Sequence, residues 1–208
     1  MQFFDRKKAG EELGKLLKKK WKKDVVVFAL PRGGVVTAAA VASVLHAPLR
    51  IVISRKIGHP MEPEYAIAAI SEHGHLIHDT NEVHKVSHVW LAQEIIRQQD
   101  EICRRQKVYD RDLHDSLKGK IAIIVDDGVA TGLTIRAAIA DIQDEHPKKI
   151  IVATPVSFST VVSQLKKEID DVVVLESPTN FFGGVSMYYQ NFPQVSDEEI
   201  ITLLSRQA

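Results

Sequence analysis

The sequence predicts an α/β fold in which a five-stranded parallel sheet is flanked by helices. Its short apolar runs are rich in Val and Ile and do not alternate with polar residues, which is typical of strands buried on both faces. Segments with helical spacing of apolar residues lie between these runs. With 208 residues, 45% of them hydrophobic and 26% charged, the chain fits one globular domain over 1–208 with an insertion at 57–117.

The first elements are a helix and then a strand–helix–strand unit. Apolar residues recur at three- and four-residue spacing across 7–21, with lysines between them, which predicts an amphipathic helix. They are Ala9, Leu13, Leu16, Leu17 and Trp21. A strand at 25–30, a turn at 31–34, a helix at 35–46 and a strand at 49–54 then form a predicted βαβ unit.

The insertion is predicted to contain a hairpin and a long helix. The hairpin strands are 66–71 and 75–78, on either side of a turn at His73 and Gly74. The helix spans 83–110 and is mostly polar.

The same order of elements recurs after the insertion and completes the sheet. The predicted strands are 121–125, 149–154 and 172–176, and the predicted helices are 134–146 and 160–169. With the two earlier strands the total is five, and they are parallel because helices connect them.

The charge balance excludes one broad class of function. Lys and Arg number 27 and Asp and Glu number 27, so the formal net charge is zero, unlike that of a protein whose whole surface binds a polyanion. Residues 1–23 nevertheless carry nine basic against three acidic side chains, a net +6, and the remainder carries −6. A nucleic-acid or anionic-membrane patch on this segment is the alternative to a solvated helix face.

The cysteine and histidine content bears on the cellular compartment and on metal binding. Cys103 is the single cysteine, so no internal disulfide forms and a reducing cytoplasm is expected. No apolar run approaches the roughly 20 residues of a membrane-spanning helix, so no membrane partner is expected. His73, His75 and His78 are closely spaced, but no cysteine or carboxylate cluster accompanies them, which disfavours zinc binding.

The residues that carry chemistry lie where one predicted strand meets a helix. The strand 121–125 ends at Asp126 and Asp127, and a loop of small residues, 128–132, opens the next helix. Ligands of open α/β sheets bind at this carboxyl edge, and the N–H groups of such a loop favour phosphate, with Thr131 and Thr134 adding hydroxyls. The two carboxylates suit the vicinal hydroxyls of a sugar and a hydrated Mg²⁺ ion; a tight turn with solvated aspartates is the alternative. Neither G-x-x-x-x-G-K-[ST] nor G-x-G-x-x-G occurs, which excludes a P-loop and a dinucleotide fingerprint.

This stretch resembles the phosphoribosyl pyrophosphate signature of type I phosphoribosyltransferases, in which an apolar strand, paired acids and a T-G-x-T loop follow one another. Further segments resemble one bacterial and archaeal branch of that family, a loosely characterised set of phosphoribosyltransferase-domain proteins. They are LPRGGV at 30–35, RKIG at 55–58, PEYAI at 63–67, and the tail 192–204 with VSDEE at 195–199. The resemblance covers essentially the whole chain and implies the type I phosphoribosyltransferase fold, with a flap hairpin and a helical hood insertion.

The resemblance also implies roles for particular residues. Those expected to hold the 5′-phosphate are Ala130, Thr131, Gly132, Leu133 and Thr134. Those expected to hold the pyrophosphate are Pro31, Arg32, Gly33, Gly34, Arg55 and Lys56. The residues expected to be catalytic are Asp126, Asp127 and Lys56. The two aspartates would also hold the ribose hydroxyls and Mg²⁺, the metal mainly through water, beneath a mobile flap at 57–78.

Three further expectations concern particular residues. Phe181 and Phe182 are candidates to stack on the base, with packing in the core as the alternative. Relatives often contain a non-proline cis peptide in the pyrophosphate loop, which we expect here between Pro31 and Arg32. Enzymes for 6-oxopurines carry an aspartate where this chain has Ala130, which disfavours hypoxanthine or guanine as the acceptor.

The implied activity is that of a cytoplasmic pentosyltransferase. It would use phosphoribosyl pyrophosphate and Mg²⁺ to transfer ribose 5-phosphate to a nucleobase or similar nitrogen nucleophile, releasing pyrophosphate. One alternative is a regulatory protein that senses phosphoribosyl pyrophosphate and binds nucleic acid through the basic N-terminal helix. Another is a non-catalytic protein that uses the helix 83–110 as an interface, and a homodimer is open in either case.

Overall fold

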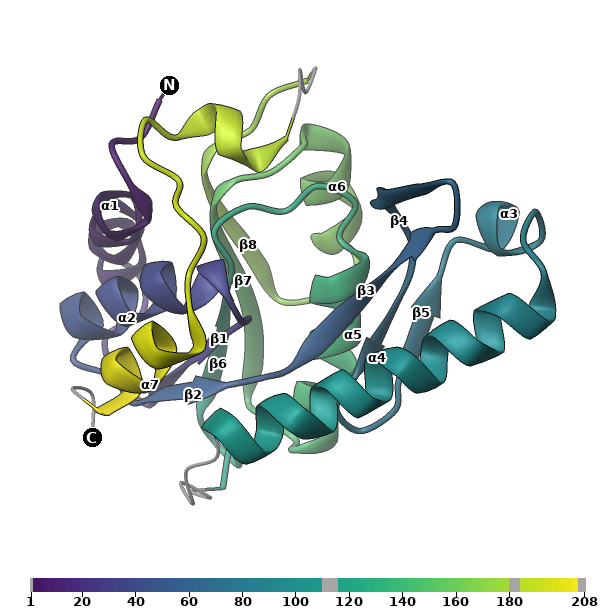
Figure 1. Cartoon of the computed structure of the whole chain (residues 1–208). Helices are drawn as coiled ribbons and strands as arrows, with labels where there is room; N and C mark the ends of the chain where they lie inside the picture. The colour runs from purple at the N-terminus through teal and green to yellow at the C-terminus, as the bar shows by residue number, and fades with distance from the viewer. Residues whose placement is uncertain (1, 110–115, 180–183, 206–208) are drawn as a thin grey trace.

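A parallel sheet of five strands runs through the computed structural model, which describes residues 2–109, 116–179 and 184–205 (Figure 1). In spatial order the strands are β2 (Leu49–Ile51), β1 (Val25–Ala29), β6 (Ile121–Val125), β7 (Lys149–Val156) and β8 (Asp171–Glu176). Every neighbouring pair is parallel. The predicted sheet is therefore confirmed.

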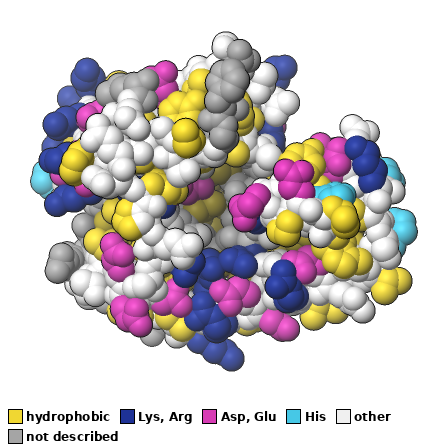
Figure 2. Space-filling view, turned by 45° about the horizontal axis from the view of Figure 1, so that its top comes forward, with side chains coloured by type: hydrophobic (Ala, Val, Ile, Leu, Met, Phe, Trp, Pro, Cys, Tyr) yellow, Lys and Arg dark blue, Asp and Glu magenta, His cyan; other side chains and the backbone are white. Residues whose placement is uncertain are grey.

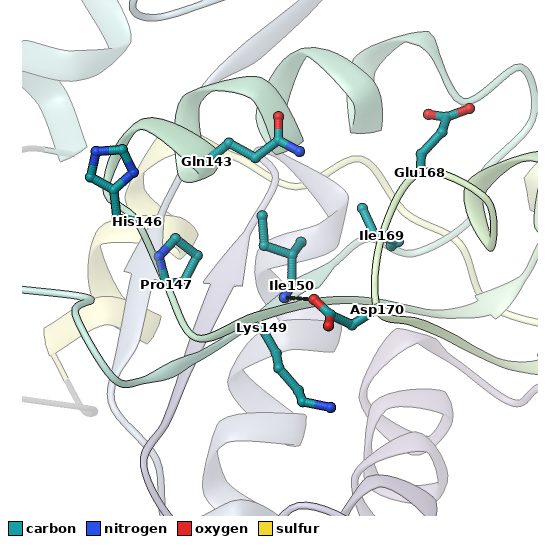
Figure 3. Close-up of a pocket in the computed structure, with 8 residues that line it drawn as sticks. All are labelled: Gln143, His146, Pro147, Lys149, Ile150, Glu168, Ile169 and Asp170. Atoms are coloured by element: carbon teal, nitrogen blue, oxygen red, sulfur yellow. Dashed lines mark hydrogen bonds between the residues drawn. The ribbon is translucent and has the colours of Figure 1, made fainter.

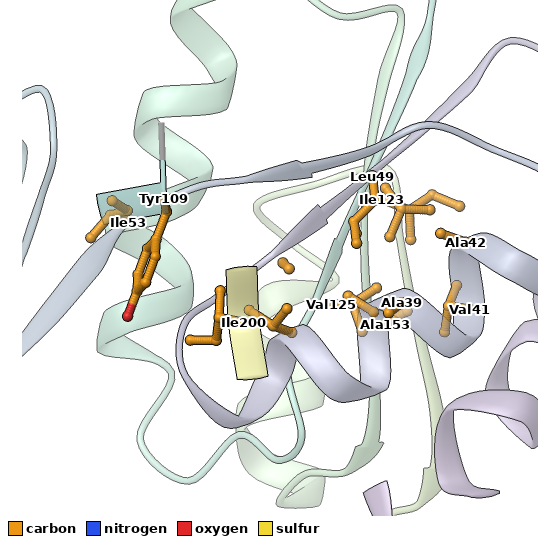
Figure 4. Close-up of a cluster of buried hydrophobic side chains, with 14 of the residues drawn as sticks. Ala39, Val41, Ala42, Leu49, Ile53, Tyr109, Ile123, Val125, Ala153 and Ile200 are labelled. Atoms are coloured by element: carbon orange, nitrogen blue, oxygen red, sulfur yellow. The ribbon is translucent and has the colours of Figure 1, made fainter. Parts of the chain in front are cut away.

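Helices cover both faces of this sheet, so its central strands are buried. On one face lie α1 (Arg6–Lys18), α2 (Gly33–Leu45) and α7 (Asp197–Ser205); on the other lie α5 (Leu133–Asp144) and α6 (Ser159–Leu165). Val27, Ile123 and Ala153 point into the first layer, where Figure 4 shows part of the packed cluster. Phe28 and Ile124 point into the second layer. The alternation explains why these strands read as unbroken apolar runs.

A second, antiparallel sheet forms the flap and stands beside the first. Its order is β3 (Ser54–His59), β4 (Glu62–Ser71) and β5 (Leu76–His78). The short helix α3 (Thr80–Val83) follows it, and the long α4 (His88–Tyr109) packs against β3 and β4. α5 lies against the opposite face of the flap sheet. The flap is thus held between two helices.

The sequence prediction of the flap was wrong in two respects. The strand expected at 49–54 ends at Ile51, and a separate strand, β3, begins at Ser54. The expected two-stranded hairpin has three strands, because β4 begins at Glu62 and pairs with β3 as well as β5. The first four residues of β4 are exposed and do not alternate between apolar and polar, so they carry no pattern by which a strand could be recognised.

Helix boundaries also differ from the prediction. The helix expected at 83–110 begins only at His88, and Val83 is instead the last residue of the short α3. Each of these helices has a side-chain cap at its start: Asp79 accepts a hydrogen bond from Asn81 N (2.9 Å), and Ser87 accepts one from Trp90 N (3.5 Å). Leu16, predicted to lie on the buried face of α1, is 39% exposed. The remaining elements are the 3₁₀ helix η1 (Val185–Tyr188) and α7.

Candidate functional site

Two loops meet at the carboxyl edge of the central sheet. β1 and β6 are neighbours in register, so the chain after Ala29 and the chain after Val125 leave the sheet side by side. A Cβ atom on Gly33 would lie 2.0 Å from Asp127 Oδ2, and one on Gly34 would lie 2.7 Å from Asp126 Oδ1. Only glycine allows this approach, so the loop 31–34 rests directly on the paired acids.

The loop 31–34 contains the cis peptide that the resemblance implied. The bond between Pro31 and Arg32 is cis, as we expected. The two glycines lie in the first turn of α2, which begins at Gly33 rather than at 35. The Arg32 side chain is exposed.

Arg6 contacts the acid pair, which consists of Asp126 and Asp127, through Asp127. No sequence motif around Arg6 predicted this contact. Its Nε donates a hydrogen bond to Asp127 Oδ2 at 2.6 Å, and its Nη1 donates one to the carbonyl oxygen of Pro193 at 2.6 Å. The guanidinium also lies 3.5 Å from the ring centre of Phe192. With side-chain exposures of 8% and 14%, Arg6 and Asp127 form a nearly buried ion pair.

A cluster of aromatic side chains that includes Tyr189 supports the loop that carries Asp126 and Asp127. The Tyr189 hydroxyl donates a hydrogen bond to the carbonyl oxygen of Asp127 at 2.5 Å. Its ring lies 5.5 Å from that of Phe3 and 4.9 Å from that of Phe192. Burial raises the pKa of Tyr189, and the charges of Asp127 and Asp126 raise it further, so the hydroxyl stays a donor. Tyr189 and Phe192 are packing residues, and they also fix the loop that carries Asp126 and Asp127.

Arg6 alone does not balance the charge of the two buried carboxyl groups of the acid pair. Burial raises the pKa of Asp126 well above its usual range, and the neighbouring Asp127 carboxylate adds to this. Burial also raises the pKa of Asp127, but the Arg6 guanidinium opposes that rise. Asp126 accepts a hydrogen bond from Asp127 N (2.8 Å), and Arg6 occupies one oxygen of Asp127. These oxygen donors suit a hydrated Mg²⁺ ion, since Mg²⁺ keeps most of its water and direct coordination at Asp127 would compete with Arg6.

The loop 128–132 leads into the N-terminus of α5. Gly132 has φ +78° and no side chain of the described residues caps the helix, so the first-turn N–H groups are free to meet an anion. Ala130 and Thr131 are exposed. Leu133 packs in a cluster with Ala69, so its contribution to a ligand would be its N–H group.

The two basic residues of β3 point to opposite faces of the flap sheet. Lys56 pairs in register with Ala69, which packs on α5 next to the loop 128–132, so Lys56 shares that face. It forms an ion pair with Glu64 at 2.6 Å. Arg55 faces α4 instead, where its Nε donates to Gln98 Oε1 at 2.8 Å.

Positive charge nevertheless gathers around Arg55. Burial lowers its pKa, and the charges of Arg105, Arg97 and Arg32 lower it further, whereas Glu101 opposes them. Figure 2, which turns the top of Figure 1 forward, shows a hollow in the visible face, with Lys and Arg as well as Asp and Glu side chains around it.

The segment after β8 also bears on the site. Phe181 and Phe182 lie outside the described residues. Val185 follows them, and a Cβ atom on Gly128 would lie 2.3 Å from its side chain, so the chain after 183 covers the start of the acid loop.

A surface pocket of about 270 Å³ lies elsewhere, among residues that include His146, Lys149 and Asp170 (Figure 3). There Asp170 Oδ2 accepts a hydrogen bond from Ile150 N at 2.8 Å. The pocket is at the amino end of β7, and ligands of open α/β sheets bind at the carboxyl ends. It is therefore separate from the candidate site.

Comparison with known proteins identifies relatives along most of the chain. A family model described as the phosphoribosyl transferase domain matches residues 4–191. Two curated proteins of Mycobacterium tuberculosis, from the strains CDC 1551 / Oshkosh and H37Rv, are each 37% identical over 207 residues and named "Putative phosphoribosyl transferase". The match covers 98% of this chain and 46% of each relative, so the chain spans about half the length of the curated relatives it matches.

Solved structures show the same fold. The crystal structure of TT1426 from Thermus thermophilus has a TM-score of 0.80, with 37% identity and 100% coverage of both chains. AQ2163 from Aquifex aeolicus has a TM-score of 0.50 at 13% identity, covering 82% of this chain and 73% of that one, and this likeness concerns the fold alone. No helix in the described part of the chain is both long and apolar enough to span a bilayer.

Proposed function

This chain belongs to the phosphoribosyl transferase domain family, and we propose that it transfers ribose 5-phosphate from phosphoribosyl pyrophosphate to a nitrogen nucleophile. The nucleophile forms a bond to the anomeric carbon of ribose. The bond from that carbon to the pyrophosphate oxygen breaks, and its electron pair leaves with pyrophosphate. A nucleobase is the acceptor class that the family resemblance favours.

The observation that supports this proposal is the meeting of three anion-binding and hydroxyl-binding elements at one sheet edge. The uncapped N-terminus of α5 would hold the 5′-phosphate through N–H groups of 130–134 and the hydroxyls of Thr131 and Thr134. Asp126 and Asp127 would accept hydrogen bonds from the ribose hydroxyls. The loop 31–34, in contact with both acids, would hold the pyrophosphate.

The chain's own charges would promote the departure of pyrophosphate. The transition state has oxocarbenium character, so negative charge builds on the leaving group while positive charge builds on the ribose. Lys56, on the flap face beside α5, and Arg32, at the exposed loop, would stabilise the leaving oxygens. The carboxylates of Asp126 and Asp127 would stabilise the ribosyl cation. Closure of the flap would exclude water and so prevent hydrolysis.

Mg²⁺ fits this site as a cofactor held through water by Asp126. When bound, it would neutralise charge on the pyrophosphate. Asp127 would take less part in holding it, because Arg6 already occupies one of its carboxylate oxygens.

The acceptor base is restricted by what the phosphate loop lacks. Ala130 offers no carboxylate to accept a proton from a 6-oxopurine. We therefore expect hypoxanthine and guanine to be poor acceptors, and a base that needs no proton acceptor at this position to be preferred.

A panel of nucleobases tests the proposal. Each base is incubated with phosphoribosyl pyrophosphate, Mg²⁺ and the protein, and pyrophosphate release is measured against a sample without base. We expect release that depends on one class of base and is lost in Asp126→Asn. Release equal to the base-free sample across the panel would contradict transfer and favour a protein that binds phosphoribosyl pyrophosphate without turning it over.

A further inference from the structure

A cluster of titratable side chains lies near the carboxyl end of α5, away from the loops described above. Glu72 and His73 follow β4 in the turn that leads to β5, and Asp141 lies in α5. One carboxylate oxygen from each acid and one ring nitrogen of His73 lie within 4.8 Å of one another. Asp141 is nine residues after Gly132, so at about 1.5 Å per residue it lies roughly 13 Å along the helix from the phosphate loop.

One oxygen of Asp141 is buried without a hydrogen-bond donor. The side chain is 2% exposed. Its Oδ1 accepts a hydrogen bond from Ser71 Oγ at 2.5 Å, whereas Oδ2 accepts none from any described residue. Burying a carboxylate oxygen that accepts no hydrogen bond costs free energy of folding, so its presence points to a partner that binds there.

The oxygen without a hydrogen bond faces an imidazole nitrogen. His73 Nδ1 lies 3.3 Å from Asp141 Oδ2, which is ion-pair distance, and no hydrogen bond joins the two atoms. Two ligand atoms bound to one tetrahedral Zn²⁺ ion, at bonds of about 2.0–2.2 Å, lie roughly 3.4 Å apart. The separation therefore matches that of two ligands of one ion.

Glu72 is held in place beside this pair. Its Oε1 accepts a hydrogen bond from Ile53 N at 3.2 Å, and its Oε2 accepts one from Gln106 Nε2 at 3.3 Å. Such bonds orient metal-binding carboxylates and leave each oxygen a further lone pair.

We propose that Glu72, His73 and Asp141 bind a divalent transition-metal ion of the Zn²⁺ class. One imidazole nitrogen with two carboxylate oxygens suits Zn²⁺ rather than Mg²⁺ or Ca²⁺, and water completes the coordination. His73 is 63% exposed, so the ion can enter from solvent. The bound ion joins the turn between β4 and β5 to α5, which fixes one end of the flap and leaves the turn between β3 and β4 free to close.

The structure thereby revises the role of the three closely spaced histidines. His73 joins a cluster with Glu72, its neighbour in sequence, and the second carboxylate comes from Asp141 in α5. His75 borders the cluster: its Nε2 lies 2.9 Å from Asp144 Oδ2 and 3.7 Å from Asp141 Oδ1.

Calorimetric titration of the chelator-treated full chain with ZnCl₂ tests the proposal, without phosphoribosyl pyrophosphate or Mg²⁺. The variants are His73→Ala, whose exposed side chain can be removed without disturbing the core, and Asp141→Asn, which retains the shape of the buried group. The matched control is His78→Ala, an exposed histidine of β5 outside the cluster. Melting curves with and without Zn²⁺ provide a second measurement.

We expect the wild type and His78→Ala to bind Zn²⁺ alike and to melt at a higher temperature with the ion. His73→Ala and Asp141→Asn should bind at least about tenfold more weakly and show little rise in melting temperature. Equal binding by the wild type and His73→Ala would overturn the proposal, as would an equal loss in His78→Ala. Neither outcome would affect the proposed transferase activity, which uses other residues.

Discussion

Arg6 joins three parts of the chain that are far apart in sequence. It lies at the start of α1, its Nε binds the carboxylate of Asp127, which is 121 residues away, and its Nη1 binds the carbonyl oxygen of Pro193. Removing one partner of a buried ion pair leaves the other charge buried and uncompensated. Arg6 therefore has a structural role in holding the acid pair as well as an electrostatic one.

We predict that Arg6→Gln lowers the free energy of unfolding by about 3 kcal/mol, within the range for breaking a buried pair. The adjacent Lys7 is exposed on α1, and Lys7→Gln is the matched control, expected to change stability by less than about 0.5 kcal/mol. Urea unfolding of the three proteins measures this. Equal stability of the two variants would show that the Arg6–Asp127 pair does not hold the loop.

Asp126 should make stability depend on pH. Its pKa is higher in the folded protein than in the unfolded chain, so the folded state binds the proton more tightly. The resulting stabilisation is present at low pH and is lost as pH rises from about 4, the ordinary carboxyl value, through the raised pKa. At neutral and higher pH, the wild type must bury a charged carboxylate.

Asp126→Asn should therefore stabilise the protein by about 1–2 kcal/mol at pH 8, with a gain that shrinks toward pH 4. The asparagine can still accept the hydrogen bond from Asp127 N through its side-chain oxygen. Urea unfolding across this pH range checks the prediction. A destabilised variant at pH 8, or a gain independent of pH, would be incompatible with a raised pKa at Asp126.

The residues of the candidate site differ in how far sequence could predict them. Asp126, Asp127 and 130–134 form one contiguous segment, so their chemistry and spacing are visible in the sequence. Arg6 was not predicted as part of the site because its partner is set by how α1 packs. The grouping of Asp141 with Glu72 and His73 was not predicted for the same reason, because those two residues come from the flap and lie near Asp141 only in the folded chain.

The flap is the element whose position matters most for the proposed reaction. Lys56 of β3 is paired with Glu64 of β4, and Glu64 is 92% exposed. The proposed binding of pyrophosphate by Lys56 would have to break or share this pair. Because the pair is exposed and screened by solvent, it stabilises this position of Lys56 by less than about 1 kcal/mol.

Glu64→Gln should therefore tighten the binding of phosphoribosyl pyrophosphate by about two- to fivefold, less at high salt. Glu62→Gln, on the exposed end of the same strand, is the control for the general loss of a negative charge. Calorimetric titration at two salt concentrations measures both. Matching gains in the two variants would assign the effect to net charge rather than to release of Lys56.

Among the elements, buried strands were the most predictable. β6 was predicted with both ends correct, because all of its residues are apolar and it lies in the centre of the sheet. β3 was missed, since its Ser, Arg, Lys, Gly and His residues form a strand only through pairing with β4. The break between α3 and α4 depends on caps at Asp79 and Ser87, which an amphipathic pattern does not reveal.

At the scale of the whole molecule, the uneven charge of the chain is partly neutralised by folding. Lys20 pairs with Asp171, Lys18 donates to the carbonyl oxygen of Val44 at 2.9 Å, and Lys8 pairs with Glu11 at 2.9 Å. Arg6 is buried against Asp127. The basic N-terminal segment therefore presents fewer free cations than its sequence suggests.

We predict that single-stranded RNA binds at about 0.15 M salt no more tightly than in non-specific binding, whose Kd is roughly 10⁻⁴–10⁻⁶ M. Fluorescence anisotropy with a labelled oligonucleotide measures this. Tighter binding whose salt dependence falls in Lys18→Gln/Lys19→Gln/Lys20→Gln would instead support the regulatory alternative.

We propose that the acid pair, the loop 31–34 and the N-terminus of α5 together bind phosphoribosyl pyrophosphate. Calorimetric titration with phosphoribosyl pyrophosphate and Mg²⁺ tests it most directly, comparing the wild type with Asp126→Asn and with Glu199→Gln, an exposed acid of α7 as control. We predict saturable binding by the wild type and the control, and binding at least about tenfold weaker in Asp126→Asn, since a charged ligand-binding group is lost. Wild-type binding no tighter than that of Asp126→Asn would contradict the assignment of this site.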